Sequence, residues 1–179
     1  MSALSKASDS FYELSATWEN ILSDCSELSE SQLSKKIDAT TWSLLEIIEH
    51  CVLVEEVVYK TLSQPALTNK ISSVDRLKPY LVKFLLSLPI KVKIPTQRVA
   101  PSGVKSFKTL KTEVTNRLTL WNNFFHNLDE SKASGTAFNH PIFGNLDLPG
   151  TFSFLVSHLR KHAKQLENRK KLAHKLTEY

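Results

Sequence analysis

The sequence predicts an all-α fold, a four-helix bundle with a long crossover between the second and third long helices. Glycine is scarce, with four residues among 179, and long stretches show apolar residues at the period of a helix. A segment rich in proline separates the second of these stretches from the third, as a crossover connection requires. The length suits one hydrophobic core, so we expect residues 1–179 to form a single domain.

The first predicted helix spans about Ser8 to Leu28. Its apolar residues recur at helical spacing and should face the core: Phe11, Leu14, Trp18, Ile21, Leu22 and Cys25. The serine-rich run that follows is interpreted as a frayed helix end and a linker. The chain contains two cysteines, Cys25 and Cys51, and because both fall within predicted helices we interpret them as free thiols.

The second predicted helix has the best start signal in the chain. Ser43 precedes Glu46 by three residues, which is the spacing of a capping box, and Trp42 and Ile47 fit a hydrophobic staple. The helix should continue to about Leu62.

His50 lies on the apolar stripe of this second helix, three residues after Ile47 and four before Val54. A buried imidazole needs a partner for its polar nitrogens. Cys51, its neighbour, should point roughly 100° away, so we expect Cys51 to pack in the core rather than to bind a metal beside His50.

Prolines dominate the stretch after Pro65. A short helix is predicted from Asp75 to Leu88. Residues 89–95 are not expected to be helical, because the segment begins with Pro89 and ends with Pro95. Apolar and basic residues alternate within this segment, which would allow a short strand. An extended connection is favoured, because no partner strand is visible elsewhere in the sequence. The third long helix should cover about Ser106 to Leu128.

The fourth long helix should begin near Asp147, a good N-cap, with Pro149 in its first turn. Its apolar seam steps alternately by four and three residues: Leu148, Phe152, Leu155, Leu159, His162 and Leu166. His158 lies beside this seam, so both histidines should face the interior of the bundle.

His158 and His162 are four residues apart and therefore project from the same face of a helix. With His50 from another helix they would offer three nitrogens to one metal and leave a coordination position open, as in catalytic sites. The alternative is three core histidines that are satisfied by hydrogen bonds.

Two blocks of sequence carry a family resemblance. The first block runs from Trp42 through Ser43-Leu44-Leu45-Glu46 to His50; the second runs from Asn139-His140-Pro141-Ile142-Phe143-Gly144 to His158, His162 and Gln165. With these blocks the chain resembles the DinB/YfiT-like superfamily of metal-binding four-helix bundles, over nearly its whole length. It departs from the usual pattern at Gly150-Thr151, where relatives often carry acidic and tryptophan residues.

The resemblance implies three ligands, His50, His158 and His162, and a divalent metal ion, commonly zinc or nickel. It also implies an enzyme, either a thiol-S-transferase that uses a low-molecular-weight thiol or a hydrolase acting on a small-molecule substrate. A non-catalytic metal-binding or stress-response bundle remains the alternative, because no carboxylate is placed clearly enough to be named as catalytic.

Three further residues are candidates for the surroundings of the metal. Gln165, three residues after His162, is the favoured hydrogen-bond partner or pocket residue. Glu46 could reach the outer nitrogen of His50, although closing the capping box is its favoured role. His140 could reach the site from its loop, or serve only the turn beside Pro141.

Charge and hydropathy restrict the partners. Seven basic and two acidic residues lie between Arg160 and Tyr179, but no aromatic residues interleave them, so nucleic-acid binding is not favoured over a solvated helix end. No stretch has the length of a membrane span and the first residues lack an apolar signal region, so a cytoplasmic protein without membrane contact is expected. A homodimer is one expected assembly.

Overall fold

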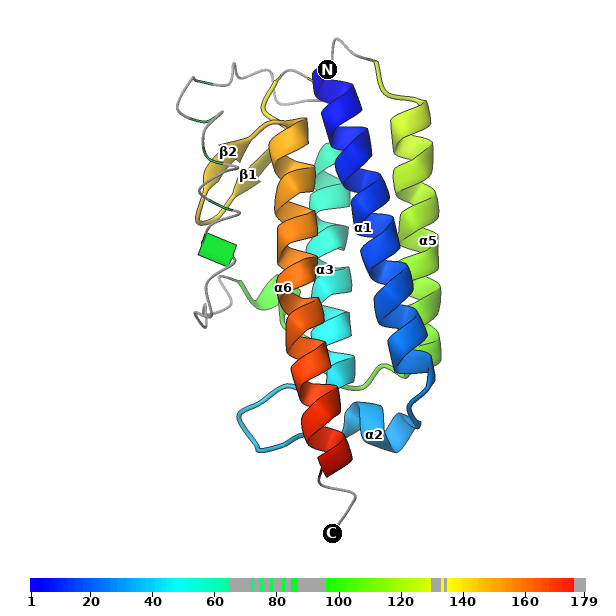
Figure 1. Ribbon diagram of the computed structural model, residues 1–179. Helices are drawn as coiled ribbons and strands as arrows, with labels where there is room; N and C mark the ends of the chain where they lie inside the picture. The colour runs from blue at the N-terminus through cyan, green and yellow to red at the C-terminus, as the bar shows by residue number, and fades with distance from the viewer. Residues whose placement is uncertain are drawn as a thin grey trace.

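Four long helices form the bundle of the computed structural model. The structure describes residues 1–64, 72, 75, 78, 82, 85, 86, 96–129, 133 and 135–175, with side chains as far as residue 171. The long helices are α1 (Ala3–Ser26), α3 (Leu44–Leu62), α5 (Phe107–His126) and α6 (Leu148–Lys175), as Figure 1 shows. The predicted all-α four-helix bundle is thereby confirmed.

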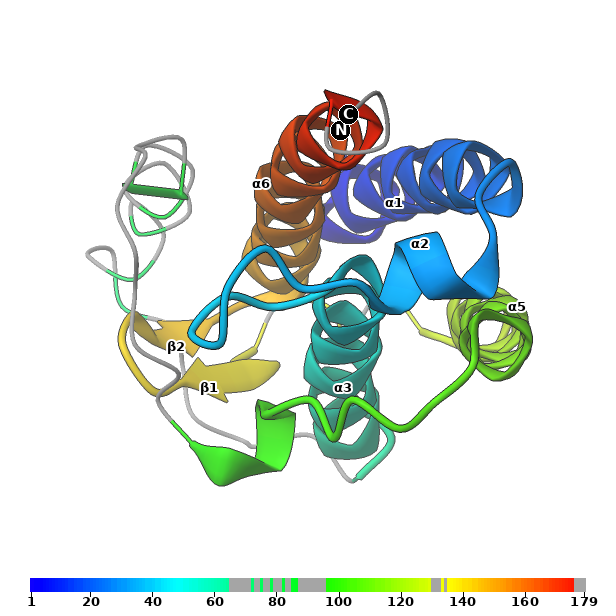
Figure 2. The ribbon, with the colours of Figure 1, turned by 90° about the horizontal axis from the view of Figure 1, so that it is seen from below.

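The helix directions explain the long connection. Seen along the bundle in Figure 2, α1 packs against α5 and α6, and α3 packs against the same two helices. The colours of Figure 1 show that α1 and α6 run downwards whereas α3 and α5 run upwards. Because α3 and α5 are parallel, the chain must return along the bundle between them. The predicted helix 75–88 and the predicted extended segment 89–95 fall mainly outside the described residues.

The prediction for the first helix and its linker is corrected in two places. Helix α1 begins at Ala3 rather than at Ser8, because the Ser2 hydroxyl accepts a hydrogen bond from the Ser5 N–H and caps the helix. The serine-rich run holds a short helix, α2 (Glu30–Ser34), where a linker was predicted. A helix of five residues is too short to show helical periodicity in the sequence.

The capping box of α3 is present as predicted. The Glu46 N–H donates to Ser43 Oγ at 3.2 Å, and the Ser43 N–H donates to the Glu46 carboxylate at 2.8 Å. The buried face of α3 is wider than the predicted apolar stripe, because Glu46, Glu49 and Glu55 are buried as well. Other parts of the chain cover α3 on several sides, so most of its surface leaves water.

The two later helices also begin where predicted. Ser106 Oγ accepts from the Thr109 N–H at the start of α5, and Asp147 Oδ1 accepts from the Gly150 N–H at the start of α6. Residues of the predicted α6 seam are buried, apart from His162, which is half-buried.

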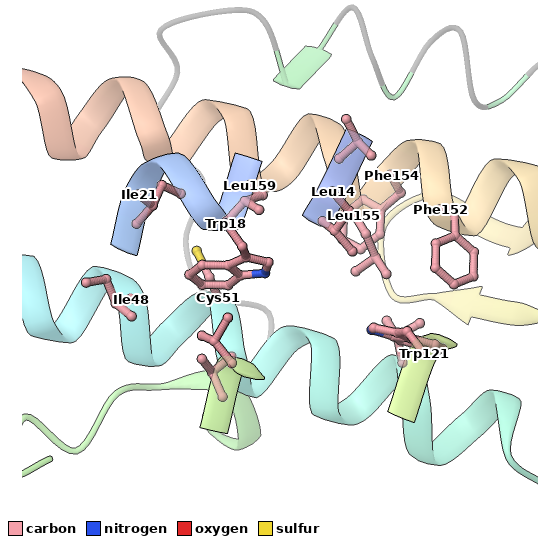
Figure 3. Packing of buried hydrophobic residues seen from close by; sticks show 14 of the residues in the cluster. Leu14, Trp18, Ile21, Ile48, Cys51, Trp121, Phe152, Phe154, Leu155 and Leu159 are labelled. Carbon is pink, nitrogen blue, oxygen red and sulfur yellow. The ribbon is translucent and has the colours of Figure 1, made fainter. Parts of the chain in front are cut away.

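Large aromatic side chains fill the centre of the bundle, as Figure 3 shows. Trp18, Trp121 and Phe152 are fully buried, and the rings of Trp121 and Phe152 meet edge to face at 4.9 Å. Both indole N–H groups donate to the buried carboxylate of Glu55. Two more residues of the core, Cys25 and Cys51, are free thiols as predicted.

A two-stranded hairpin precedes α6 and was not predicted. Strand β1 (Phe138–His140) pairs antiparallel with β2 (Gly144–Leu146), in the register Phe138 with Leu146. Gly144 adopts φ +70°, a left-handed conformation that suits glycine at the end of a three-residue loop. Strands of three residues are too short to show a period-two pattern.

Within the described residues, no helix is both long enough and apolar enough to span a membrane.

Candidate metal centre

Helices α3 and α6 bring three imidazoles together. His50 comes from α3, and His158 and His162 come from adjacent turns of α6. One nitrogen of each ring lies within 4.8 Å of one nitrogen of each of the others. The Nε2 atoms of His50 and His158 are 3.2 Å apart, and the ring centroids of the three pairs lie between 4.6 and 5.1 Å apart.

A backbone carbonyl fixes the tautomer of His50. Its Nδ1 lies 2.7 Å from the Val99 carbonyl oxygen, which can only accept, so Nδ1 carries the proton. Val99 belongs to the short 3-10 helix η2 (Gln97–Val99), which packs against α3. The lone pair of His50 is therefore on Nε2, the atom that lies near His158.

Gln165 acts in the same way on His162. Its side-chain oxygen lies 2.9 Å from His162 Nδ1, one helical turn away. The amide oxygen accepts the Nδ1 proton, so His162 also keeps its lone pair on Nε2. The rings of His50 and His162 have centroids 5.0 Å apart, and each ring carries a lone pair on Nε2. Neither Nε2 atom has a proton to donate to the other.

The donor set fits a divalent metal. Zinc–nitrogen bonds of about 2.0–2.1 Å in a tetrahedron place two nitrogens about 3.4 Å apart. The 3.2 Å between the Nε2 atoms of His50 and His158 is close to that separation. Imidazole nitrogens suit zinc and nickel. The three histidines could therefore hold one such ion.

Burial keeps these imidazoles in the form that binds metals. The pKa of His162 is lowered to about 4, mainly by burial and then by the neighbouring His50. Burial also lowers the pKa of His50, against the opposing hydrogen bond to Val99, and holds that of His158 well below its ordinary value. At neutral pH all three rings are uncharged ligands that need not lose a proton.

The other two residues predicted near the site have well-defined partners. The Glu46 carboxylate accepts from the Ser43 N–H and from the Lys36 ammonium group, while His50 Nδ1 binds Val99 instead. His140 lies at the end of β1, and its Nδ1 accepts the N–H groups of Ile142 and Phe143 at 3.1 and 3.2 Å.

His140 is also linked to the three-histidine site through the ring of Phe154. Its ring packs 4.6 Å from that of Phe154, which in turn lies 5.6 Å from the ring of His158. Since Nδ1 accepts two hydrogen bonds, the proton of the neutral ring is on Nε2. Burial lowers the pKa of His140 to about 4, so the ring is neutral at physiological pH.

Three residues around the site were missed by sequence reasoning. Val99 lies between two prolines and gives no periodic signal, and it acts through its carbonyl, which every residue has. Glu49 was overlooked because a residue adjacent to His50 on a helix points elsewhere. Trp42 was assigned to the staple, yet its ring lies 5.0 Å from that of His50.

A groove opens over the three histidines. Its volume is about 1750 Å³. Trp42, Ile142 and Phe154 provide apolar lining, and the polar face of α6 provides Lys161, Gln165 and Arg169. A small molecule in this groove would have direct access to the imidazoles.

Comparisons with known proteins agree with this architecture. A solved structure described as TT2238, a four-helix bundle protein, matches with a TM-score of 0.57 and 17% sequence identity, over 90% of this chain and 98% of the other. No curated protein matches the chain. The sequence model of the DinB superfamily matches residues 13–166, a range that contains all three histidines, and the chain therefore belongs to the DinB superfamily.

Proposed function

We propose that this protein is a metal-dependent enzyme that binds one divalent ion, zinc or nickel, through His50, His158 and His162. One observation carries the proposal: the Nδ1–H groups of His50 and His162 are both engaged by oxygen acceptors, which leaves two Nε2 lone pairs beside His158. A proton on His158 Nε2 can satisfy only one of these lone pairs, as in the His50–His158 hydrogen bond, whereas one divalent cation would satisfy all three nitrogens.

The reaction class follows from the donor set. A divalent ion held by three neutral imidazoles would keep its full charge and would supply Lewis acidity, which would lower the pKa of a water or thiol bound to it. The chain's own part is to hold the imidazoles in their neutral form and to line the groove above them with the apolar rings of Trp42 and Phe154. Transfer to or from a low-molecular-weight thiol and hydrolysis of a small molecule are both supported by this arrangement.

The groove favours an anionic substrate. Its lining contains six basic and two acidic residues: Arg160, Lys161, Lys164, Arg169, Lys170 and Lys171 against Asp24 and Glu167. Arg160, Lys170 and Lys171 are paired with carboxylates. Lys164 and Arg169 make no ion pair with the described part of the chain, so they are available to a carboxylate or phosphate of the substrate.

A second candidate is a metal-binding bundle without catalysis. The nearest buried carboxylates on α3, those of Glu46 and Glu49, are turned to Lys36 and to Ser102 respectively. No carboxylate of the described residues belongs to the three-residue group that could hold the metal, so a general base from the protein is not identified. Under this alternative the metal would only stabilise the fold.

Metal analysis followed by a thiol-conjugation assay tests the proposal. Protein purified without a histidine tag should bind one zinc or nickel ion per chain, and His162→Ala should abolish this binding. His126→Ala is the matched control, because His126 is exposed on α5 and its Nδ1 binds only its own helix. Absence of stoichiometric metal after incubation with both ions would refute the metal site.

Activity separates the two candidates. An enzyme should catalyse conjugation of a thiol such as cysteine or glutathione with an electrophile, or hydrolysis of an ester or amide, only when it is loaded with metal. Stoichiometric metal together with no turnover in either assay series would favour the structural role.

A further inference from the structure

Glu49 is a buried carboxylate next to a proposed metal ligand, yet it does not face the metal site. Glu49 exposes only 2% of its surface to solvent. Glu49 Oε1 accepts the Ser102 hydroxyl proton at 2.7 Å, and Oε2 accepts the Gly103 N–H at 3.0 Å. A buried carboxylate is costly unless its oxygens are satisfied, and here both oxygens are satisfied by one short segment.

That segment, residues 96–103, is called the strap here. Thr96 starts it, with its hydroxyl accepting the Arg98 N–H and its carbonyl accepting the Val99 N–H. The strap lies against α3, and the Val99 side chain is buried. Three hydrogen bonds join the strap to two adjacent residues of α3. The Val99 carbonyl accepts from His50 Nδ1, and Ser102 and Gly103 both donate to the Glu49 carboxylate.

The strap approaches α3 closely at Gly103. This residue has φ +73°, and a Cβ atom there would lie 3.1 Å from Glu46 Oε1. Glycine therefore meets both a conformational and a steric requirement. The close approach puts the Gly103 N–H within reach of Glu49.

We propose that Glu49 is a positioning residue for the metal ligand His50. Glu49 holds the strap at residues 102 and 103, and the strap then holds the Val99 carbonyl against His50 Nδ1. The result is a His50 ring with fixed orientation and with its lone pair on Nε2. This inference rests on the proposed metal site, but its first test needs no metal.

Adjacency on the helix explains why these two residues work together. Neighbouring residues of a helix project about 100° apart, so His50 can face α6 while Glu49 faces the strap. Only two residues lie between Val99 and Ser102, so a hydrogen bond at one point restricts the chain at the other. Glu46 is occupied by its own cap and by Lys36, which leaves Glu49 as the anchor of residues 102 and 103.

The first test measures the tautomer of His50 in the metal-free full-length chain. Long-range ¹H–¹⁵N correlation spectra of the imidazoles, assigned with His50→Gln, should show the Nδ1–H form in the wild type. Glu49→Ala should convert His50 to a mixture of both tautomers, because the Val99 carbonyl is no longer held. Glu49→Gln should restore the Nδ1–H form, since its amide oxygen can accept from Gly103 and its NH₂ can donate to the Ser102 hydroxyl.

The second test measures the dissociation constant for Zn²⁺ by competition with a chelator. Glu49→Ala should weaken binding by about 10- to 100-fold, the effect typical of losing a group that orients a ligand. Glu49→Gln should remain within about threefold of the wild type, and Ser102→Ala should lie between them. Glu55→Gln is the control, because Glu55 is another buried carboxylate of α3 that binds Trp18 and Trp121 instead of the strap.

The outcomes separate the possibilities. An unchanged His50 tautomer in Glu49→Ala would overturn the positioning role, whether or not the protein binds metal. Equal losses of zinc affinity in Glu49→Ala and Glu55→Gln would show a general stability effect and would also overturn it. If Glu49→Ala does not fold, Ser102→Ala carries the same test. A wild type with the expected tautomer but without metal binding would refute the proposed function and leave the role of Glu49 at His50 intact.

Discussion

His50 Nε2 lies 3.2 Å from His158 Nε2, although 108 positions separate the two residues in the chain. The packing of α3 against α6 brings them together, and the buried apolar faces of both helices fix the rotation of each helix about its axis. The site is therefore a property of the bundle rather than of one flexible loop. This rigidity matters because ligands that are already in place pay little ordering entropy when a metal binds.

Metal binding should stabilise the folded protein. A metal present at about 100 times its dissociation constant adds about 2.7 kcal/mol, which corresponds to roughly 5–11 °C in melting temperature for a chain of this size. Calorimetry with and without Zn²⁺ measures this shift. His158→Ala should show almost no shift, whereas His126→Ala should shift like the wild type. A similar shift in His158→Ala would place the bound ion elsewhere.

Gln165 should tune the affinity of the site for metal. Removing its carbonyl group in Gln165→Ala frees the His162 ring and should weaken zinc binding by about tenfold, because the Nδ1–H loses its acceptor. Gln165→Glu should bind zinc at least as tightly as the wild type, since a carboxylate is a stronger acceptor. Chelator competition measures both, with the exposed His126→Ala as the control. An unchanged affinity in Gln165→Ala would show that the hydrogen bond does not orient His162.

Two substitutions of His140 should show whether its Nδ1 atom stabilises the turn of the hairpin. Asparagine places an oxygen near the position of Nδ1, so His140→Asn should keep the hydrogen bonds from Ile142 and Phe143. Glutamine instead reaches the position of Nε2, so His140→Gln should lose about 1–2 kcal/mol of folding stability. Urea unfolding measures the difference. Equal stability of both variants would mean that the turn does not depend on Nδ1.

The sequence predicted the helices and the three histidines because both depend on local periodicity. The capping box at Ser43 and the seam around His162 are patterns within a few residues, and they place the side chains on definite faces. The partners of these histidines are less local. Gln165 was recognised because it lies one turn from His162, whereas the carbonyl of Val99 reaches His50 only through the tertiary packing of the strap.

Buried carboxylates were the main surprise within the helices. Glu49 and Glu55 look like residues of a solvated face, because glutamate is rarely buried without a partner. Their partners lie on the strap, on α1 and on α5, at distances along the chain that no helical pattern can show. Short elements such as α2 and the hairpin escaped for a related reason, since few residues carry too little periodic information.

Glu55 should make the stability of the bundle depend on pH near neutrality. Burial raises the pKa of its carboxyl group from 4.5 to about 7, against the opposing hydrogen bonds from Trp18 and Trp121. Between these two values the folded protein keeps a proton that the unfolded chain has lost, so the stabilising contribution of Glu55 is complete at low pH and declines as pH rises through 7. Wild-type protein should therefore lose about 2–3 kcal/mol relative to Glu55→Gln between pH 5 and pH 8, as measured by urea unfolding. The histidines titrate alike in both proteins and cancel in this difference. A difference that stays constant with pH would show that the carboxyl group of Glu55 keeps an ordinary pKa between the two indoles.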